Sequence, residues 1–311
     1  MYRNAQDAKR RIRTGMDLSS FAFYAMLKFM TKIILVDGMS IVFRSFYAIN
    51  MWNSKNLHIG AIYGFLKQIV KLIDIYKSPY IVIGFDMKQE TWRHRIHSEY
   101  KSNRRSTPPE LIPQFEMVRN VCAILGLKVY EGDGYEADDW IASCAHTYSN
   151  NARVYIVSTD KDFLQLVSSQ VVVFNPFNGI EIDQAGVVQK WGVTSEQVVD
   201  FLSLTGDEVD AVPGVYGIGP KTAARWLNEY GNIENIISNS PNLTPISKRN
   251  HLSQGIENLY KAKMLITLYK TLEVDTIDAI RMRPSMQDAS NFLRAHEIDL
   301  GGRLEYALRS I

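Results

Sequence analysis

Residues 32–37 read KIILVD, residues 80–86 read YIVIGFD, and residues 154–160 read VYIVSTD. Each segment is a short apolar run rich in β-branched residues that ends in an aspartate, which is typical of a buried strand leading into a loop. Similar runs predict further strands at Leu127–Tyr130 and Val171–Phe174, and the stretches between them predict helices at Gly60–Tyr76, Leu111–Leu125, Glu136–Tyr148 and Phe163–Val167. Strands that alternate with helices indicate an α/β fold with a mainly parallel sheet covered on both faces. After about Ile182 the pattern predicts only helices and turns.

Three aspartates follow the three quoted runs: Asp37, Asp86 and Asp160. In open parallel sheets the carboxyl ends of the strands border the ligand crevice, so we expect these carboxylates on one rim. A single aspartate after a strand more often caps a helix or begins a turn. Three at equivalent places favour a site.

Other acidic residues can join this rim from nearby segments. They are Asp162, then Glu136, Asp138 and Asp139 in GYEADD (Gly134–Asp139), and Asp207 and Asp210 in LTGDEVD (Leu204–Asp210). Acids at a helix start would also be explained by the helix dipole. Carboxylates this crowded cannot all stay ionised without compensation, which divalent cations supply. Oxygen ligands suit Mg²⁺ or Mn²⁺, and two ions roughly 4 Å apart can stabilise a phosphoryl displacement.

The charge of the chain is unevenly distributed. The 311 residues carry a net charge of only +2, yet residues 88–105 contain Lys88, Arg93, Arg95, Lys101, Arg104 and Arg105 against Glu90 and Glu99. A charge run alone is usually a solvated helix face, whereas one basic stripe in a nearly neutral protein is expected where a polyanion binds.

The first 30 residues stand apart from this pattern. A basic segment, residues 9–13, precedes the apolar stretch Phe21–Phe29, which is too short for the ~20 residues of a membrane span. An organelle transit peptide, a surface helix, or residues upstream of a start at Met30 would each explain it. Only two cysteines occur, Cys122 and Cys144, so we expect no disulfide framework and a reducing interior.

Residues 212–224 read VPGVYGIGPKTAA. Gly214, Gly217 and Gly219 permit positive φ and close approach by another backbone. Pro220 suits the first turn of a helix, whose N–H groups attract an anion. The segment predicts a helix-hairpin-helix that binds DNA, with an ordinary turn between helices as the alternative.

These motifs together resemble the 5′-nuclease domain of bacterial DNA polymerase I and the stand-alone bacteriophage 5′-exonucleases, relatives of the flap endonucleases. The resemblance runs from about residue 32 to 272. It rests on LVDGMSIVFRSFYA (Leu35–Ala48), GFD (Gly84–Asp86), EYKSNR (Glu99–Arg104), GYEADD, STDKDFLQL (Ser158–Leu166) and GDEVDAVPGVYGIGPKTA (Gly206–Ala223), which occur in family order. The residues before Met30 have no counterpart in the shared core.

The resemblance implies roles for individual residues. The nine acids named above match the family's metal-site carboxylates. Lys101 and Arg104 match the pair on the helical arch that contacts the scissile phosphate. The main-chain carbonyls of Leu204, Thr205, Pro213, Val215 and Ile218 match a potassium site, and the residues expected to bind DNA are Arg44, Tyr100, Gly217, Ile218, Gly219, Pro220, Lys221 and Thr222.

The sequence therefore predicts an N-terminal extension (1–30), an α/β nuclease core (31–184) with a PIN-like sheet and an arch at about 88–112, and a helical DNA-binding region (185–311) with its helix-hairpin-helix at about 204–230. We expect a Mg²⁺- or Mn²⁺-dependent 5′→3′ exonuclease or flap endonuclease with K⁺ in the hairpin. Its partners would be branched or 5′-ended DNA, RNA–DNA hybrid and a DNA polymerase. We expect a cytoplasmic monomer that binds no membrane, with organelle targeting by residues 1–30 left open. The alternatives are a structure-specific DNA-binding protein without catalysis and, from Asp160 and Asp162 after a strand, an aspartate-based phosphatase.

Overall fold

The computed structural model describes residues 30–87, 89–104 and 106–311, and its centre is a six-stranded sheet. The strand order is β3-β2-β1-β4-β5-β6. The strands are β1 (Lys32–Asp37), β2 (Ile81–Gly84), β3 (Lys128–Tyr130), β4 (Arg153–Val157), β5 (Val171–Asn175) and β6 (Ile180–Ile182). The first five are parallel, and only the edge strand β6 pairs antiparallel. The predicted mainly parallel sheet is confirmed.

Apolar side chains on both faces of the sheet explain why the strand sequences are almost continuously hydrophobic. Successive residues of β1 point to opposite faces, so Ile33 and Leu35 enter one core while Ile34 and Val36 enter the other. All four side chains are fully buried. This double burial fixes the register of β1 between β2 and β4. It thereby also fixes the position of the Asp37 side chain at the carboxyl ends of the strands.

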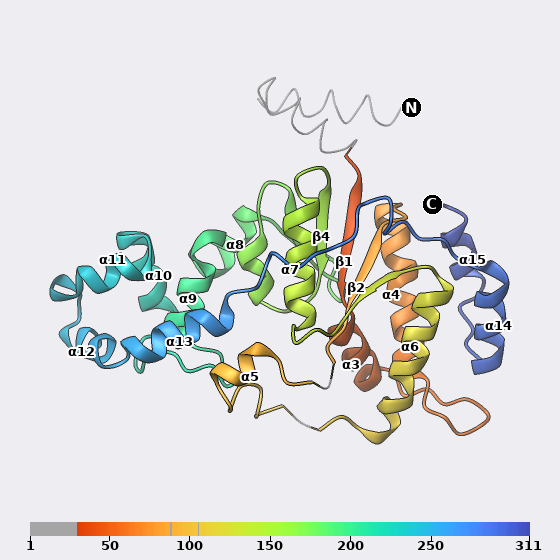
Figure 1. The fold of residues 1–311 in the computed structure, drawn as a ribbon, viewed down its shortest axis with the longest axis horizontal. Coiled ribbons are helices and arrows are strands. Elements are labelled where there is room, and N and C mark those ends of the chain that lie inside the picture. The colour runs from red at the N-terminus through yellow and green to blue at the C-terminus, as the bar shows by residue number, and fades with distance from the viewer. Residues whose placement is uncertain (1–29, 88, 105) are drawn as a thin grey trace.

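Helices cover both faces, as predicted (Figure 1). The second face, which contains Ile34 and Val36, is covered by α3 (Gly38–Ala48), α4 (Gly60–Tyr76), η1 (Pro109–Leu111), α6 (Ile112–Ile124), α14 (Met286–His296) and α15 (Arg303–Leu308). The first face carries α7 (Ala137–Tyr148), η2 (Asp162–Leu166) and helices from residues 184–266. Helix α3 was not among the predicted helices, and the helix expected at 163–167 is a 3-10 turn.

The helical region after the sheet lies to one side of the core (Figure 1). It contains α8 (Gln184–Trp191), η3 (Ser195–Gln197), α9 (Val198–Thr205), α10 (Pro220–Tyr230), α11 (Ile233–Ser238), η4 (Ser240–Asn242), α12 (Ile246–Gln254) and α13 (Ile256–Ile266). The chain then returns across the core, where Met282 N donates to Pro79 O at 2.8 Å. The predicted region 185–311 is thus divided in space, because α14 and α15 pack against α6 and α4 at the opposite end.

The segment predicted as a helical arch has little helix among its described residues. Only α5 (Trp92–Ile96) and η1 are helical, and turns connect them. Lys88 and Arg105 of the basic stripe, and residues 1–29 of the predicted N-terminal extension, lie outside the described residues.

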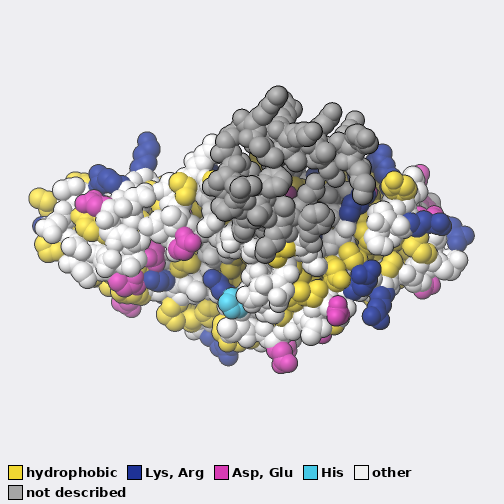
Figure 2. Space-filling view, turned by 90° about the horizontal axis from the view of Figure 1, so that it is seen from above, with side chains coloured by type: hydrophobic (Ala, Val, Ile, Leu, Met, Phe, Trp, Pro, Cys, Tyr) yellow, Lys and Arg dark blue, Asp and Glu magenta, His cyan; other side chains and the backbone are white. Residues whose placement is uncertain are grey.

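The face seen from above in Figure 2 lies opposite the carboxyl ends of the strands. Its described part carries basic and acidic side chains interspersed among apolar and other atoms. No helix among the described residues is both long and apolar enough to cross a membrane. Cys122 and Cys144 are buried with free thiols.

Candidate active site

The three aspartates predicted at the rim stand together at the carboxyl ends of β1, β2 and β4. Asp37 is the last residue of β1, and its carboxylate accepts from Ser40 N at 2.9 Å and from Ser158 Oγ at 2.7 Å. Asp86 accepts from Ala137 N at 2.7 Å, which ties the end of β2 to the start of α7. Electrostatic interactions of Asp37 with Asp160 and Asp86 join the three into one cluster.

Four carboxylates of this cluster are buried or partly buried and form no ion pair with a described residue. Burial, with a smaller contribution from the charges of Asp160 and Asp86, raises the pKa of Asp37 to about 6 despite the two hydrogen bonds. Burial and the charge of Asp160 raise the pKa values of Asp138 and Asp162 well above the usual range. The pKa of Asp160 is also raised, mainly by burial. One oxygen of Asp162, Oδ1, is buried and has no hydrogen-bond partner among the described residues.

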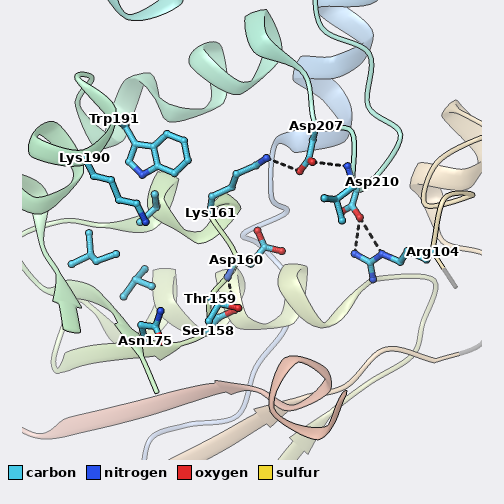
Figure 3. Close-up of a pocket in the computed structure, with 14 residues that line it drawn as sticks. Arg104, Ser158, Thr159, Asp160, Lys161, Asn175, Lys190, Trp191, Asp207 and Asp210 are labelled. Carbon is cyan, nitrogen blue, oxygen red and sulfur yellow. Dashed lines mark hydrogen bonds and ion pairs between the residues drawn. The ribbon is translucent and has the colours of Figure 1, made fainter. Parts of the chain in front are cut away.

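Cations of the arch and Lys161, which precedes η2, pair with three other carboxylates of the site, and Figure 3 shows the pairs of Asp207 and Asp210. Lys101 Nζ lies 2.9 Å from Glu136 Oε2, and Lys161 Nζ lies 3.0 Å from Asp207 Oδ2. Arg104 donates to Asp210 Oδ1 through Nε at 3.0 Å and Nη2 at 2.8 Å.

The structure places the Asp139 side chain in an ion pair with Arg93, apart from the carboxylates of the strand ends. Both of its oxygens are bound by the Arg93 guanidinium, at 2.7 and 2.8 Å, and its side chain is fully buried. Tyr269 N and Trp92 Nε1 donate to the same carboxylate. The reason is helix geometry: Asp138 and Asp139 point in different directions from the first turn of α7, and only Asp138 turns toward the aspartates of the strands.

Arg93 is a residue that the sequence analysis counted only as one charge of the stripe. It is 1% exposed and also donates to Leu265 O at 2.7 Å and to Glu136 Oε2 at 3.3 Å. It therefore joins α5, the start of α7 and the end of α13. An arginine in a charge run gives no sign in sequence that its partner is a distant buried acid.

The arch also contacts the turn that carries Asp207 and Asp210. Lys101 has a left-handed backbone, with φ of 58°, and its N–H donates to Asp210 O at 3.0 Å. Asn103 Nδ2 donates to Glu208 O at 3.0 Å. Hydrogen bonds to main-chain carbonyls of the turn therefore hold the EYKSNR motif beside it and bring Lys101 and Arg104 to the carboxylates.

Tyr100, which the resemblance implies as a DNA-binding residue, is covered by other parts of the protein in this structure. This side chain is 6% exposed, packs in the core, and donates its hydroxyl to Glu136 Oε2 at 3.1 Å. Burial raises its pKa, so the hydroxyl remains a donor. Arg44, by contrast, is exposed on α3, and its guanidinium lies 4.1 Å from the centre of the Phe177 ring.

The helix-hairpin-helix is formed by α9, the segment from 206 to 219, and α10. Of the three glycines expected to need special backbone freedom, only Gly217 has positive φ, 73°. Gly214 is needed for a close approach, because a Cβ there would lie 2.5 Å from Gly206 N. Gly219 faces open space, so a side chain there would meet only an approaching ligand.

The exposed part of the hairpin is narrower than the predicted DNA-binding stretch. Gly217, Gly219, Pro220 and Lys221 are exposed, whereas Ile218 and Thr222 are buried. Thr222 Oγ1 accepts from Lys248 of α12. Among the carbonyls predicted to bind K⁺, those of Leu204 and Val215 accept bonds from Val215 N and Ile218 N. Thr205, Pro213, Val215 and Ile218 line a cavity of about 500 Å³.

Two family models cover most of the chain. The N-terminal resolvase-like domain of 5′-3′ exonucleases matches residues 32–192, and the C-terminal SAM fold of 5′-3′ exonucleases matches residues 193–288. The chain belongs to the 5′-3′ exonuclease family. This confirms the predicted family, fold class and class of enzyme, a nuclease.

Relatives include both stand-alone members of the family and polymerases. The chain is 38% identical to a 5′-3′ exonuclease of Aquifex aeolicus (strain VF5) over 79% of its own length and 84% of the relative's. It is 32% identical to a 5′-3′ exonuclease of Bacillus subtilis (strain 168), covering 86% and 93%. It is 35% identical to a DNA polymerase I of Rhizobium leguminosarum, but spans only 27% of that protein.

Solved structures of the family share the fold. A 5′-exonuclease of bacteriophage T5 with bound zinc superimposes with a TM-score of 0.67 and 21% identity, covering 89% of this chain and 97% of that one. The catalytic core of Rad2 in complex with a DNA substrate gives a TM-score of 0.60 at 17% identity, covering 91% and 94%. Both likenesses extend over the sheet and the helical region.

Proposed function

We propose that this member of the 5′-3′ exonuclease family hydrolyses DNA phosphodiesters near 5′ ends and at 5′ flaps, using divalent metal ions. The observation that carries the proposal is the cluster of buried or partly buried, unpaired carboxylates at the strand ends, faced by Lys101 and Arg104. Such a cluster is unfavourable unless cations bind to it.

The residues present fit divalent metal, although no three Asp, Glu, His or Cys side chains among the described residues form a ready-made metal site. The donor set is all oxygen, which suits Mg²⁺ or Mn²⁺. Asp162 Oδ1 is buried without a partner, as expected of a ligand atom. Electrostatic coupling divides the cluster into two parts that meet at Asp160: Asp37, Asp86 and Asp138 on one side, and Asp162, Asp207 and Asp210 on the other. We assign one ion to each part, with Glu136 beside the first.

When bound, such ions would lower the pKa of water and neutralise charge on the phosphate oxygens. Lys101 would leave Glu136 as that carboxylate turns to metal, and its ammonium would then stabilise charge that develops on the scissile phosphate. Arg104 would do the same from Asp210. Asp37 is kept in place by Ser40 and Ser158, so its oxygens need little reorganisation.

The hairpin would bind the duplex part of the substrate. The exposed main chain of Gly219 and Lys221 and the Lys221 ammonium suit a phosphate and carry no sequence information. Carbonyls of the hairpin would hold K⁺. Gly219→Val should weaken duplex binding and lower the slope of log affinity against log salt by somewhat under one unit. Unchanged affinity and slope would show that the segment is only a turn.

The substrate and context follow the relatives. Flaps, 5′-ended duplexes and RNA–DNA hybrids all present a 5′ strand beside a duplex, and removal of primers or flaps would link the protein to a DNA polymerase in the cytoplasm. Relatives named DNA polymerase I support this link.

The test is digestion of end-labelled flap, nicked and single-stranded DNA. We expect short 5′ fragments from flap DNA with Mg²⁺ or Mn²⁺ and no cutting in EDTA. Full activity in EDTA would overturn the metal mechanism. Binding without cutting under every metal condition would instead favour a non-catalytic DNA-binding protein.

A further inference from the structure

The cleft at the carboxylates continues beyond them into a second compartment. One cavity of about 510 Å³ contains Asp160, Asp207 and Asp210 at one end and Asn175, Lys190 and Trp191 at the other. Figure 3 shows these two groups on opposite sides of the same cavity, with Lys161 between them. The second group comes from the end of β5 and the end of α8, two elements that the proposed reaction does not use.

The cationic side chains at the two ends of the cavity differ in whether they form ion pairs. Arg104 and Lys161 at the acidic end are paired with Asp210 and Asp207. Lys190 is exposed and forms no ion pair or hydrogen bond with any described residue, and its ammonium lies 5.5 Å from the Trp191 ring. No carboxylate lines the far compartment, so Lys190 is available to an anion there.

Two further donors in this compartment lack partners. The indole Nε1 of Trp191 is buried and has no acceptor among the described residues. Asn175 uses Oδ1 to accept from Phe177 N at 3.0 Å, which leaves its amide nitrogen to donate. A buried N–H without an acceptor is unfavourable, so native structures seldom keep one without a reason.

We propose that this compartment binds one nucleotide of the strand that is cut, with its phosphate at Lys190 and its base against Trp191. An ammonium, two N–H donors and an aromatic ring match a phosphate joined to a base, and aromatic rings bind bases of any sequence. The apolar floor of Leu164 and Val173 excludes water from the base. The inference rests on the proposed function, because the shared cavity places this nucleotide close to the scissile bond.

The experiment measures binding without cutting. Flap DNA is titrated in EDTA, and the base at each position near the branch is replaced in turn by an abasic site. For the wild type we expect one position at which base removal raises the Kd by about fivefold or more. Trp191→Ala should bind intact DNA more weakly by the same factor and lose the sensitivity at that position. Trp191→Phe, which keeps a ring, should retain it.

A second series replaces single phosphates by uncharged methylphosphonates. We expect the wild type to respond at a phosphate next to the sensitive base and Lys190→Ala to lose that response. Tyr306→Ala and Lys77→Ala are the controls, since both residues are exposed and lie outside this cavity. The second series remains decisive if Trp191→Ala does not fold.

Abasic and methylphosphonate profiles that Trp191→Ala and Lys190→Ala share with the wild type would overturn the inference. That result would not affect metal-dependent cutting of DNA. Cutting that does not depend on metal would instead overturn the proposed function, and the DNA-binding profiles measured in EDTA would not change. The two failures are therefore distinguishable.

Discussion

Two groups of carboxylates lie near the carboxyl ends of the central strands and differ in their partners. In the unpaired group, Asp37, Asp138, Asp160 and Asp162, burial raises every pKa. In the paired group, Glu136, Asp139, Asp207 and Asp210, each side chain contacts a lysine or an arginine. Sequence spacing does not separate the two groups, since Asp138 and Asp139 are neighbours.

The difference in pairing indicates which carboxylates stabilise the fold and which are available to bind a ligand. Removing one partner of a buried ion pair is strongly destabilising, so the Arg93–Asp139 pair fixes the arch to α7. The unpaired group opposes folding at neutral pH, as expected of groups kept for binding rather than for stability. Glu136 belongs to both roles: burial acts to raise its pKa, but Lys101 and Arg93 outweigh burial and lower it.

The largest effect should come from the unpaired group. Asp160 lies where the two halves of the cluster meet, so Asp160→Asn should lower the cleavage rate by at least about 10³-fold, or roughly 4 kcal/mol in the barrier. DNA affinity should stay within a few-fold, because the same substitution removes a negative charge near the phosphate. Single-turnover cleavage and equilibrium binding of one flap substrate measure both quantities. Cleavage reduced only tenfold would mean that the unpaired group does not hold the reacting metal.

Lys101 should come next, since it joins the two groups. If its ammonium acts on the scissile phosphate, Lys101→Ala should lower the single-turnover rate at saturating DNA by about 10²–10³-fold, with affinity falling less than ~10-fold. Arg95→Ala is the matched control, because Arg95 is an exposed residue of the same basic stripe. Equal, small effects of both substitutions would mean that the arch acts only as an electrostatic field.

Asp138 and Asp139 give the sharpest test of the comparison. Asp139→Asn should lower the free energy of unfolding by about 3 kcal/mol, because it leaves the buried Arg93 guanidinium without its anion. It should change metal affinity little. Asp138→Asn should do the reverse: metal affinity falls and stability does not. Denaturant unfolding and calorimetric metal titration compare the two variants. The same outcome for both would put Asp139 back among the metal ligands.

Regions with a regular apolar periodicity could be predicted from the sequence. The strands at β1, β2, β4 and β5 and the helix α4 follow from apolar periodicity, and α4 has the predicted bounds. The rim of Asp37, Asp86 and Asp160 followed from strand ends alone. What failed depends on contacts between distant segments.

Three residues illustrate that limit. Tyr100 and Arg93 lie in a segment whose charges predict exposure, yet both are buried by partners 35 or more positions away in sequence. Thr222 stands in a motif that predicts DNA contact, but Lys248 of α12 covers it. Local sequence indicates which residues can bind a ligand, whereas tertiary packing decides which of them already contact other residues of the protein.

The smallest effect concerns pH and uses the raised pKa values of the unpaired group. The pKa of Asp37 is about 6 in the folded chain against 3.8 in the unfolded chain. Between these values the folded state binds more protons, so the free energy of unfolding falls as pH rises toward 6. Acidification from pH 7 to 5 in EDTA should therefore stabilise the protein by about 1 kcal/mol through Asp37 alone.

Other groups contribute to the pH dependence of the wild type. The raised pKa values of Asp138, Asp160 and Asp162 act in the same direction as that of Asp37. Burial lowers the pKa of His58, which acts in the opposite direction on acidification, and the lowered pKa of Glu136 contributes only below about pH 4.5. Asp37→Asn isolates the effect, because asparagine still caps α3 and cannot ionise. This variant should be more stable than the wild type at pH 7 in EDTA, and the difference should shrink by about 1 kcal/mol at pH 5.

With saturating Mg²⁺ the pH dependence of stability should reverse for the wild type, since protons compete with metal for the same oxygens. Urea unfolding at both pH values, with and without Mg²⁺, gives the four free energies required. A wild type that is equally stable at both pH values in EDTA, with no gain from Asp37→Asn, would mean that Asp37 is already compensated and belongs with the paired group.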